Sequence, residues 1–145
     1  MPNNIDWVQK YTVIPYVNGG RDFSGIDCYG IVYLVYKTER NIIIPTFEEL
    51  AYSEYWYKKK STYKICQNAC RELVEKRFFF EVEKPKTFDM LVFMDEDRRI
   101  SQHVGIYVGR GRFLEAPSEY SPAVISVLEH KKYKLANILR YNENA

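Results

Sequence analysis

The chain has 145 residues, the size of one domain that can bury a core without disulfide bonds. It carries 21 Lys and Arg against 19 Asp and Glu, interspersed along the sequence, so it lacks the basic patch of a nucleic-acid-binding protein. We therefore expect a single domain over residues 1–145 with no nucleic-acid partner.

The N-terminal half of the chain carries helical signals. Apolar residues recur three and four positions apart, and Pro15 ends the first of these stretches. Thr46, followed by Glu48 and Glu49, predicts the cap of a third helix. The expected helices span residues 4–11, 28–39, 46–57 and 61–76.

Strand signals follow, and near Phe88 the hydrophobic period changes from that of a helix to that of a strand. Pro85 separates the first strand from the others. The expected strands span residues 78–82, 90–94, 103–108, 112–114, 124–128 and 135–141. Helices followed by an antiparallel sheet define an α+β fold.

The cysteines and the absence of long apolar runs bear on compartment and cofactors. Cys66 and Cys70 lie four residues apart on the core side of an expected helix, and the total of three cysteines is odd, which indicates reduced thiols. No second cysteine pair or nearby histidine completes a set of four ligands, so no metal site is expected. We also expect that the chain does not insert into a membrane. We expect it to be made in the host cytoplasm without a signal peptide.

Cys28 follows a loop that contains Gly19, Gly20 and Gly25, and it precedes a helical apolar stripe. Asp27 is a good N-cap residue, so Cys28 is expected as the first helical residue. The unpaired N–H groups of a helix start favour a thiolate over a thiol, as a nucleophile requires. The alternative is that Cys28 is an ordinary small residue of the core.

His103 is the histidine that could serve such a nucleophile as a base. A three-residue turn after Val108 would place Gly105 opposite Glu115, so that His103 and Glu115 share one face of the sheet. The carboxylate could then orient the imidazole, although a two-residue turn would reverse the parity. The alternatives are a half-buried strand histidine and a solvent-facing strand end. His130 lies among charged residues and is expected to be solvated.

The motifs around these residues resemble those of the NlpC-type cysteine peptidases, a papain-like group. The resemblance covers essentially the whole chain and implies a papain-like fold, with N-terminal helices packed on a C-terminal antiparallel sheet. Its segments, in the family's order, are Tyr16-x-x-Gly19-Gly20, Asp27-Cys28-x-Gly30-Ile31-Val32, Phe88 to Phe93 and His103 to Gly109.

The resemblance implies a hydrolase that cleaves γ-D-glutamyl to diamino-acid bonds, or related amides, in peptidoglycan stem peptides. Cys28 corresponds to the nucleophile and His103 to the general base, and neither a metal nor an organic cofactor is needed. Glu115 occupies the third position, where the family usually has a histidine or another neutral polar residue. Oxyanion or substrate-binding contacts are expected from Tyr16, Asp27 and Tyr29.

The residue after the nucleophile bears on the biological setting. Tyr29 stands where secreted wall enzymes usually have serine, which is more like the family's versions in phage tails. We therefore expect a phage or prophage tail-tip component that is incorporated in the virion, with other tail proteins as partners. The alternatives are a structural or assembly protein of the tail tip that keeps the fold without activity, and another amidase or acyltransferase of the same group.

Overall fold

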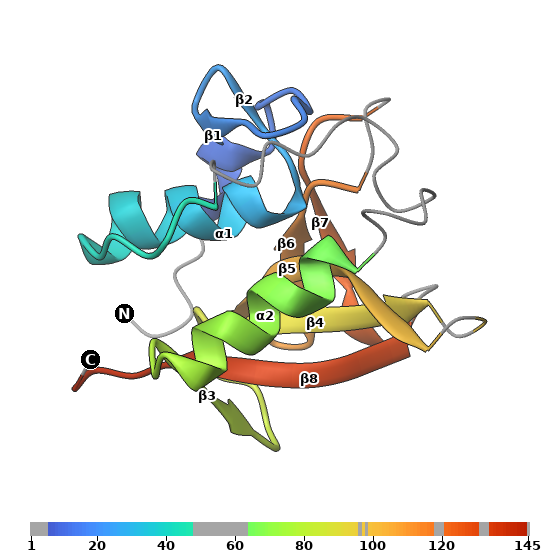
Figure 1. Ribbon diagram of the computed structural model, residues 1–145. Helices are drawn as coiled ribbons and strands as arrows, with labels where there is room; N and C mark the ends of the chain where they lie inside the picture. The colour runs from blue at the N-terminus through green and yellow to red at the C-terminus, as the bar shows by residue number, and fades with distance from the viewer. Residues whose placement is uncertain are drawn as a thin grey trace.

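The computed structural model (Figure 1) describes residues 6–47, 64–95, 97, 99–117, 121–130 and 134–144. Its large sheet is antiparallel, with six strands in the order β3-β8-β4-β5-β6-β7, and the α+β expectation is confirmed. The strands of this sheet are β3 (Phe79–Val82), β4 (Met90–Asp95), β5 (Ile100–Gly109), β6 (Arg112–Glu115), β7 (Val124–Val127) and β8 (Lys134–Tyr141).

The described N-terminal segment differs from the expected helix and loop. The helix expected over residues 4–11 is, in its described part, a 3-10 helix, η1 (Asp6–Tyr11). Its three-residue spacing continues where the Thr12 N–H donates to the Gln9 carbonyl at 3.1 Å. The loop before Cys28 also contains a small hairpin, β1 (Arg21–Asp22) and β2 (Gly25–Ile26). The hairpin was not expected because each strand has only two residues.

The helix that begins at Cys28 was expected to continue to Glu39. It is α-helical as α1 (Cys28–Val35) and then widens into a π-helical turn, η2 (Tyr36–Arg40). Asn41 ends the helix with a φ of 55°, a left-handed conformation that asparagine tolerates at such ends.

The expected helix over residues 46–57 falls almost entirely outside the described residues. Thr46 and Phe47, its described beginning, are not helical. The next helix, α2 (Ile65–Glu75), confirms the described part of the expected span 61–76. Among the described residues, no helix is long and apolar enough to cross a membrane.

Both described α-helices pack on the same side of the large sheet. α1 and α2 each contact β5, and α2 also contacts β3. The main core lies between these helices and the sheet, and it includes Val92, Val104 and Leu73, all at most 1% exposed. In Figure 1, α1 lies beside the β1-β2 hairpin at one end of this layer.

Strand residues next in sequence to those of the main core point to the other face of the sheet, where they form a second, smaller cluster. Its members are Leu91, Phe93, Phe113 and Ile138. Because side chains alternate along a strand, this cluster marks the face that His103 shares with Phe93, its partner across the β4-β5 ladder.

The turn between β5 and β6 differs from the one that the sequence suggested. Gly109 pairs with Arg112, so two residues form the turn, but the register shifts between Tyr107 and Gly109. This bulge adds one residue to β5 and restores the parity that a two-residue turn alone would reverse. Ile106 pairs with Leu114, so the same register continued by one residue sets Gly105 opposite Glu115, as expected.

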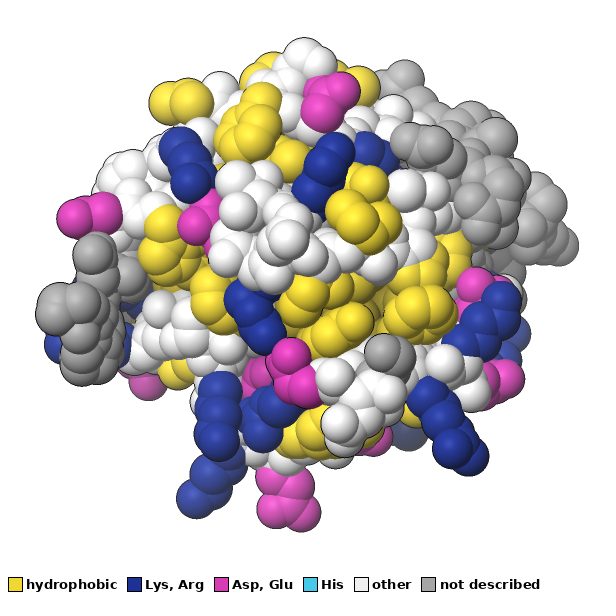
Figure 2. Space-filling view, turned by 90° about the vertical axis from the view of Figure 1, so that its left-hand side faces the viewer, with side chains coloured by type: hydrophobic (Ala, Val, Ile, Leu, Met, Phe, Trp, Pro, Cys, Tyr) yellow, Lys and Arg dark blue, Asp and Glu magenta, His cyan; other side chains and the backbone are white. Residues whose placement is uncertain are grey.

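An ion pair joins two neighbouring strands of the large sheet, β4 and β8. Asp89, 2% exposed, forms an ion pair with Arg140, whose Nη2 and Nε lie 2.7 and 3.0 Å from its two carboxylate oxygens. This pair ties the start of β4 to the end of β8. On the face in Figure 2, side chains of both charge signs surround hydrophobic ones, without a patch of one sign.

Candidate active site

The loop before α1 is held by the carboxylate of Asp27. Asp27 Oδ1 accepts a hydrogen bond from the Gly30 N–H at 2.8 Å, which confirms Asp27 as the N-cap and Cys28 as the first helical residue. Oδ2 accepts a second bond from the Gly19 N–H at 2.9 Å. One buried side chain therefore fixes both the start of the helix and the glycine turn that precedes it.

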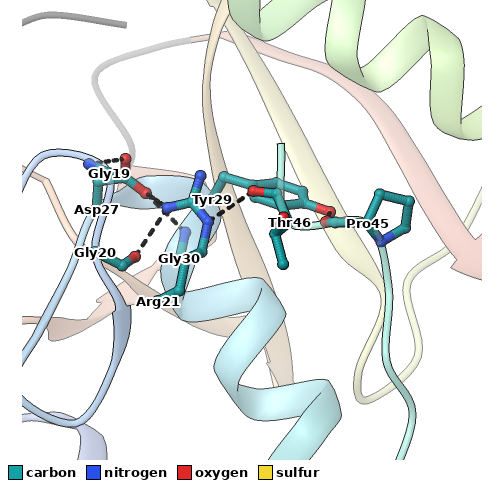
Figure 3. Close-up of polar contacts among 8 residues, drawn as sticks. All are labelled: Gly19, Gly20, Arg21, Asp27, Tyr29, Gly30, Pro45 and Thr46. Carbon is teal, nitrogen blue, oxygen red and sulfur yellow. Dashed lines mark hydrogen bonds and ion pairs between the residues drawn. The ribbon is translucent and has the colours of Figure 1, made fainter. Parts of the chain in front are cut away.

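Arg21 completes this arrangement and was missed by the sequence analysis (Figure 3). Its Nη1 lies 2.8 Å from Asp27 Oδ1 and donates to the Gly20 carbonyl, also at 2.8 Å. Its Nε donates to the Thr46 carbonyl at 2.8 Å. A lone arginine directly after two glycines was the available signal, but only the fold shows that this side chain is buried, at 8% exposure.

Tyr29 and Gly30 pack closely against the same loop. The Tyr29 hydroxyl donates to the Pro45 carbonyl at 2.6 Å, and the Arg21 guanidinium lies 5.2 Å from the centre of its ring. A Cβ on Gly30 would lie 2.0 Å from the Gly20 carbonyl oxygen, so only glycine allows this approach of helix and loop.

Cys28 is partly exposed as a residue, but its sulfur is buried against β5. The backbone N–H of Val104 donates a hydrogen bond to this sulfur. Val104 lies in the part of β5 that precedes its pairing with β6, which runs from Ile106 to Gly109. Cys28 thus contacts β5 at Val104, the residue that follows His103 in the strand.

The pKa of the Cys28 thiol is raised to about 12, opposite to the direction expected for a helix start. Burial is the largest cause, and the negative charge of Asp27 adds to it. The Val104 N–H and the charge of Arg21 lower the pKa but do not outweigh burial. In the free protein Cys28 is therefore a thiol at neutral pH.

This raised pKa predicts how Cys28 reacts with iodoacetamide. Because only the thiolate reacts, and its fraction grows about tenfold per pH unit below the pKa, labelling should accelerate about tenfold per unit from about pH 7 to 9. Labelling is followed by mass spectrometry of the peptide that contains Cys28. A rate that levels off below about pH 8 would contradict the raised pKa and restore the activated thiolate.

His103 and Glu115 meet as expected. His103 Nε2 lies 2.6 Å from Glu115 Oε1, and the two residues are 8% and 3% exposed. The His103 ring also lies against that of Phe93, with 5.8 Å between ring centres. Glu115 is therefore not the solvent-facing strand end that the sequence left open, and it engages one particular nitrogen of the imidazole.

A third polar side chain extends this pair and was also missed by the sequence analysis. The Ser126 hydroxyl donates to Glu115 Oε2, so the carboxylate is held from both sides. Ser126 lies on β7, where Glu115 pairs with Val124. A serine within the apolar run Val124 to Val127 was a signal, but assigning it required the register between β6 and β7.

The other expected site residues have described partners within the protein. Tyr16 is half-buried and forms an isolated parallel bridge with Ile26, two residues before Cys28. Asp27 and Tyr29 are 1% and 8% exposed, with the internal contacts given above. A direct contact of these three residues with substrate stays a prediction.

The remaining thiols lie close to the same region. Cys66 and Cys70 are buried on α2, as expected, and their mutual hydrogen bond together with burial raises the pKa of Cys66 well above its usual value. Within the described ranges, no group of three or more His, Cys, Asp or Glu side chains is placed to hold a metal ion. The chemistry of this site is therefore argued from its thiol, imidazole and carboxylate.

Comparison with known proteins identifies the family. The sequence matches the NlpC/P60 family over residues 13–139. It is 29% identical over 106 residues to murein DD-endopeptidase MepH of Escherichia coli (strain K12), covering 71% of this chain and 31% of that protein. It is 30% identical over 137 residues to gamma-DL-glutamyl hydrolase of Bacillus subtilis (strain 168), covering 92% of this chain and 28% of that protein.

A solved structure supports the same assignment of the fold. The NlpC/p60 domain of the peptidoglycan hydrolase SagA is similar with a TM-score of 0.55 and 23% identity, over 89% of this chain and 90% of that one. The chain spans less than a third of the length of the two curated relatives described above, at 31% and 28%. With a match that extends over most of its residues, the chain belongs to the NlpC/P60 family.

Proposed function

We propose that this protein is a cysteine peptidase that hydrolyses amide bonds in the stem peptides of peptidoglycan. The observation that carries the proposal is the buried His103 to Glu115 pair, 2.6 Å between Nε2 and Oε1, on the strand that Cys28 contacts. The names of the relatives support the substrate class, since one is a murein endopeptidase and the other a glutamyl hydrolase.

The raised pKa of Cys28 shapes the proposed mechanism. Because the thiol is neutral at rest, its proton leaves as the sulfur attacks the amide carbonyl, and His103 accepts it. Glu115 occupies Nε2, so Nδ1 is the nitrogen that takes the proton. Glu115 then stabilises the imidazolium.

His103 also moves the proton in the later steps of the reaction. His103 returns the proton to the leaving amine, and the acyl group stays on sulfur as a thioester. Water, deprotonated by His103, attacks the thioester, and the acid product leaves as the bond to sulfur breaks. His103 then passes its proton to the Cys28 sulfur and restores the thiol. The backbone N–H of Cys28 at the start of α1 helps to hold the oxyanion in both steps.

We further propose that the chain works in a phage or prophage tail tip, where it aids penetration of the wall. The support is Tyr29, an aromatic residue directly after the nucleophile, where secreted wall enzymes usually carry serine. The structure gives this residue a supporting task, since its hydroxyl binds the Pro45 carbonyl. The competing assignment, an inactive assembly protein of the tail, is tested by the next experiment.

The proposed activity is tested by digestion of defined muropeptides. Stem peptides of the diaminopimelate and lysine types are incubated with the protein after a thiol assay has shown that Cys28 is reduced. We expect mass spectrometry to show two fragments whose masses sum to that of the substrate plus one water. Intact substrate of both types would exclude the peptidase and favour the assembly protein.

A further inference from the structure

The ion pair between Arg21 and Asp27 lies directly before the proposed nucleophile and is almost fully buried. Its side chains are 6% and 2% exposed, and the joining atoms are 2.8 Å apart. Figure 3 shows the guanidinium between the loop on one side and Tyr29 with residues 45 and 46 on the other. A buried ion pair contributes little net stability on its own, so its place beside Cys28 calls for another explanation.

The charged and titratable groups around Cys28 come from three parts of the fold. Asp27 and Arg21 belong to the loop, and Cys66 and Cys70 lie on α2. On β5, His103 directly precedes Val104, whose N–H binds the sulfur. Among the charged groups that act on the Cys28 sulfur, the Asp27 carboxylate has the largest effect and the Arg21 guanidinium the next.

These two charges act on Cys28 in opposite directions. The Asp27 carboxylate opposes negative charge on the neighbouring sulfur, and the Arg21 guanidinium favours it. Asp27 is required for another reason, because it caps α1 and fixes Gly19. A cation paired with Asp27 therefore offsets the charge that this cap places beside the sulfur.

On the basis of the proposed cysteine-peptidase function, we propose that Arg21 is a positioning residue for Cys28. It neutralises Asp27 and fastens the nucleophile loop to the Thr46 carbonyl, so that the sulfur can take up negative charge while it stays at the start of α1.

Arginine suits both parts of this role better than lysine. Nε reaches the Thr46 carbonyl while Nη1 binds Asp27 and the Gly20 carbonyl. A planar guanidinium holds these acceptors at fixed angles, whereas one ammonium group cannot reach both sides of the loop. Arg21→Lys therefore separates the two effects, because it keeps the positive charge beside Asp27 but cannot also hold the Thr46 carbonyl.

The test measures the rate at which iodoacetamide labels Cys28 as a function of pH. Asp27→Asn keeps one oxygen for the Gly30 N–H but loses the acceptor for the Gly19 N–H. It leaves the Arg21 charge uncompensated, so labelling at about pH 7.5 should be about tenfold faster. Arg21→Gln leaves the Asp27 charge uncompensated, and labelling should be about tenfold slower. The double variant should return close to the wild-type profile.

Controls separate this effect from a loss of structure. Asp22→Asn removes an exposed carboxylate from the same loop and should leave the profile unchanged. Arg21→Lys should label more like wild type than Arg21→Gln does, but should unfold at a lower temperature. Cys66 and Cys70 report folding, because they should stay unlabelled in every folded variant.

Opposite shifts for Asp27→Asn and Arg21→Gln are the result that supports the proposal. If both variants slow labelling, or both expose Cys66 and Cys70, the pair is merely structural and the proposal is wrong. If Arg21→Gln does not fold, Asp27→Asn alone decides, since only the electrostatic role predicts acceleration. The assay needs no peptidoglycan, so an inactive wild type would reject the peptidase without affecting this result.

Discussion

Cys28→Ala is expected to abolish hydrolysis of muropeptides, with a loss of about a millionfold in kcat, the scale measured when a nucleophile is removed from a catalytic triad. No other described thiol can replace it, because Cys66 and Cys70 are buried on α2. Product formation by mass spectrometry over several hours measures the loss, and thermal unfolding checks that the variant is folded.

Cys66→Ala is the matched control for this variant. It removes a sulfur of the same type from the same region, but one that no step of the proposed reaction uses. We expect it to lower stability by about 1 kcal/mol through loss of buried volume and to retain most of the activity. Activity that survives in Cys28→Ala, or disappears equally in both variants, would contradict Cys28 as the nucleophile.

Glu115→Ala is expected to reduce kcat by about ten-thousandfold, the scale of removing the orienting acid of a known triad and less than the loss expected for Cys28→Ala. Without the carboxylate, His103 Nε2 loses its partner at 2.6 Å, and the ring loses both its orientation and the charge that stabilises the imidazolium. The effect should appear in kcat, while KM changes little, because Glu115 is only 3% exposed.

Glu115→Gln should retain much more activity than Glu115→Ala. The amide oxygen can still accept from His103 Nε2, and the Ser126 hydroxyl can turn to accept from the amide nitrogen. The variant Ser126→Ala separately measures the outer end of the chain of hydrogen bonds and should cost less than Glu115→Ala. Equal losses in the alanine and glutamine variants would mean that the negative charge, rather than orientation, is what His103 requires.

The sequence was sufficient for the elements with strong local signals. The N-cap at Asp27, the start of α1 at Cys28 and the shared face of His103 and Glu115 follow from residue type and strand parity, and the structure confirms them. The parity was nevertheless obtained through the wrong turn. A bulge before Gly109 compensates for a shorter turn, and a bulge leaves little mark on sequence periodicity.

The contacts that were missed depend on residues far apart in the chain. Arg21 binds the Thr46 carbonyl, and Ser126 binds Glu115 from the neighbouring strand. The pKa of Cys28 was also expected in the wrong direction, because burial comes from the packing of the whole core, whereas the helix-start argument uses only local backbone. Local patterns identified the candidate reacting groups, whereas tertiary packing sets the pKa of the Cys28 thiol.

The place of β8 in the sheet has a consequence for the biosynthesis of the protein. β8 lies between β3 and β4, yet it leaves the ribosome after both of them. Until Arg140 emerges, the buried carboxylate of Asp89 lacks its partner and β3 has no neighbour in the sheet. The sheet therefore stays open until β8 has been synthesised, and we expect the nascent chain to depend on chaperones until β8 inserts.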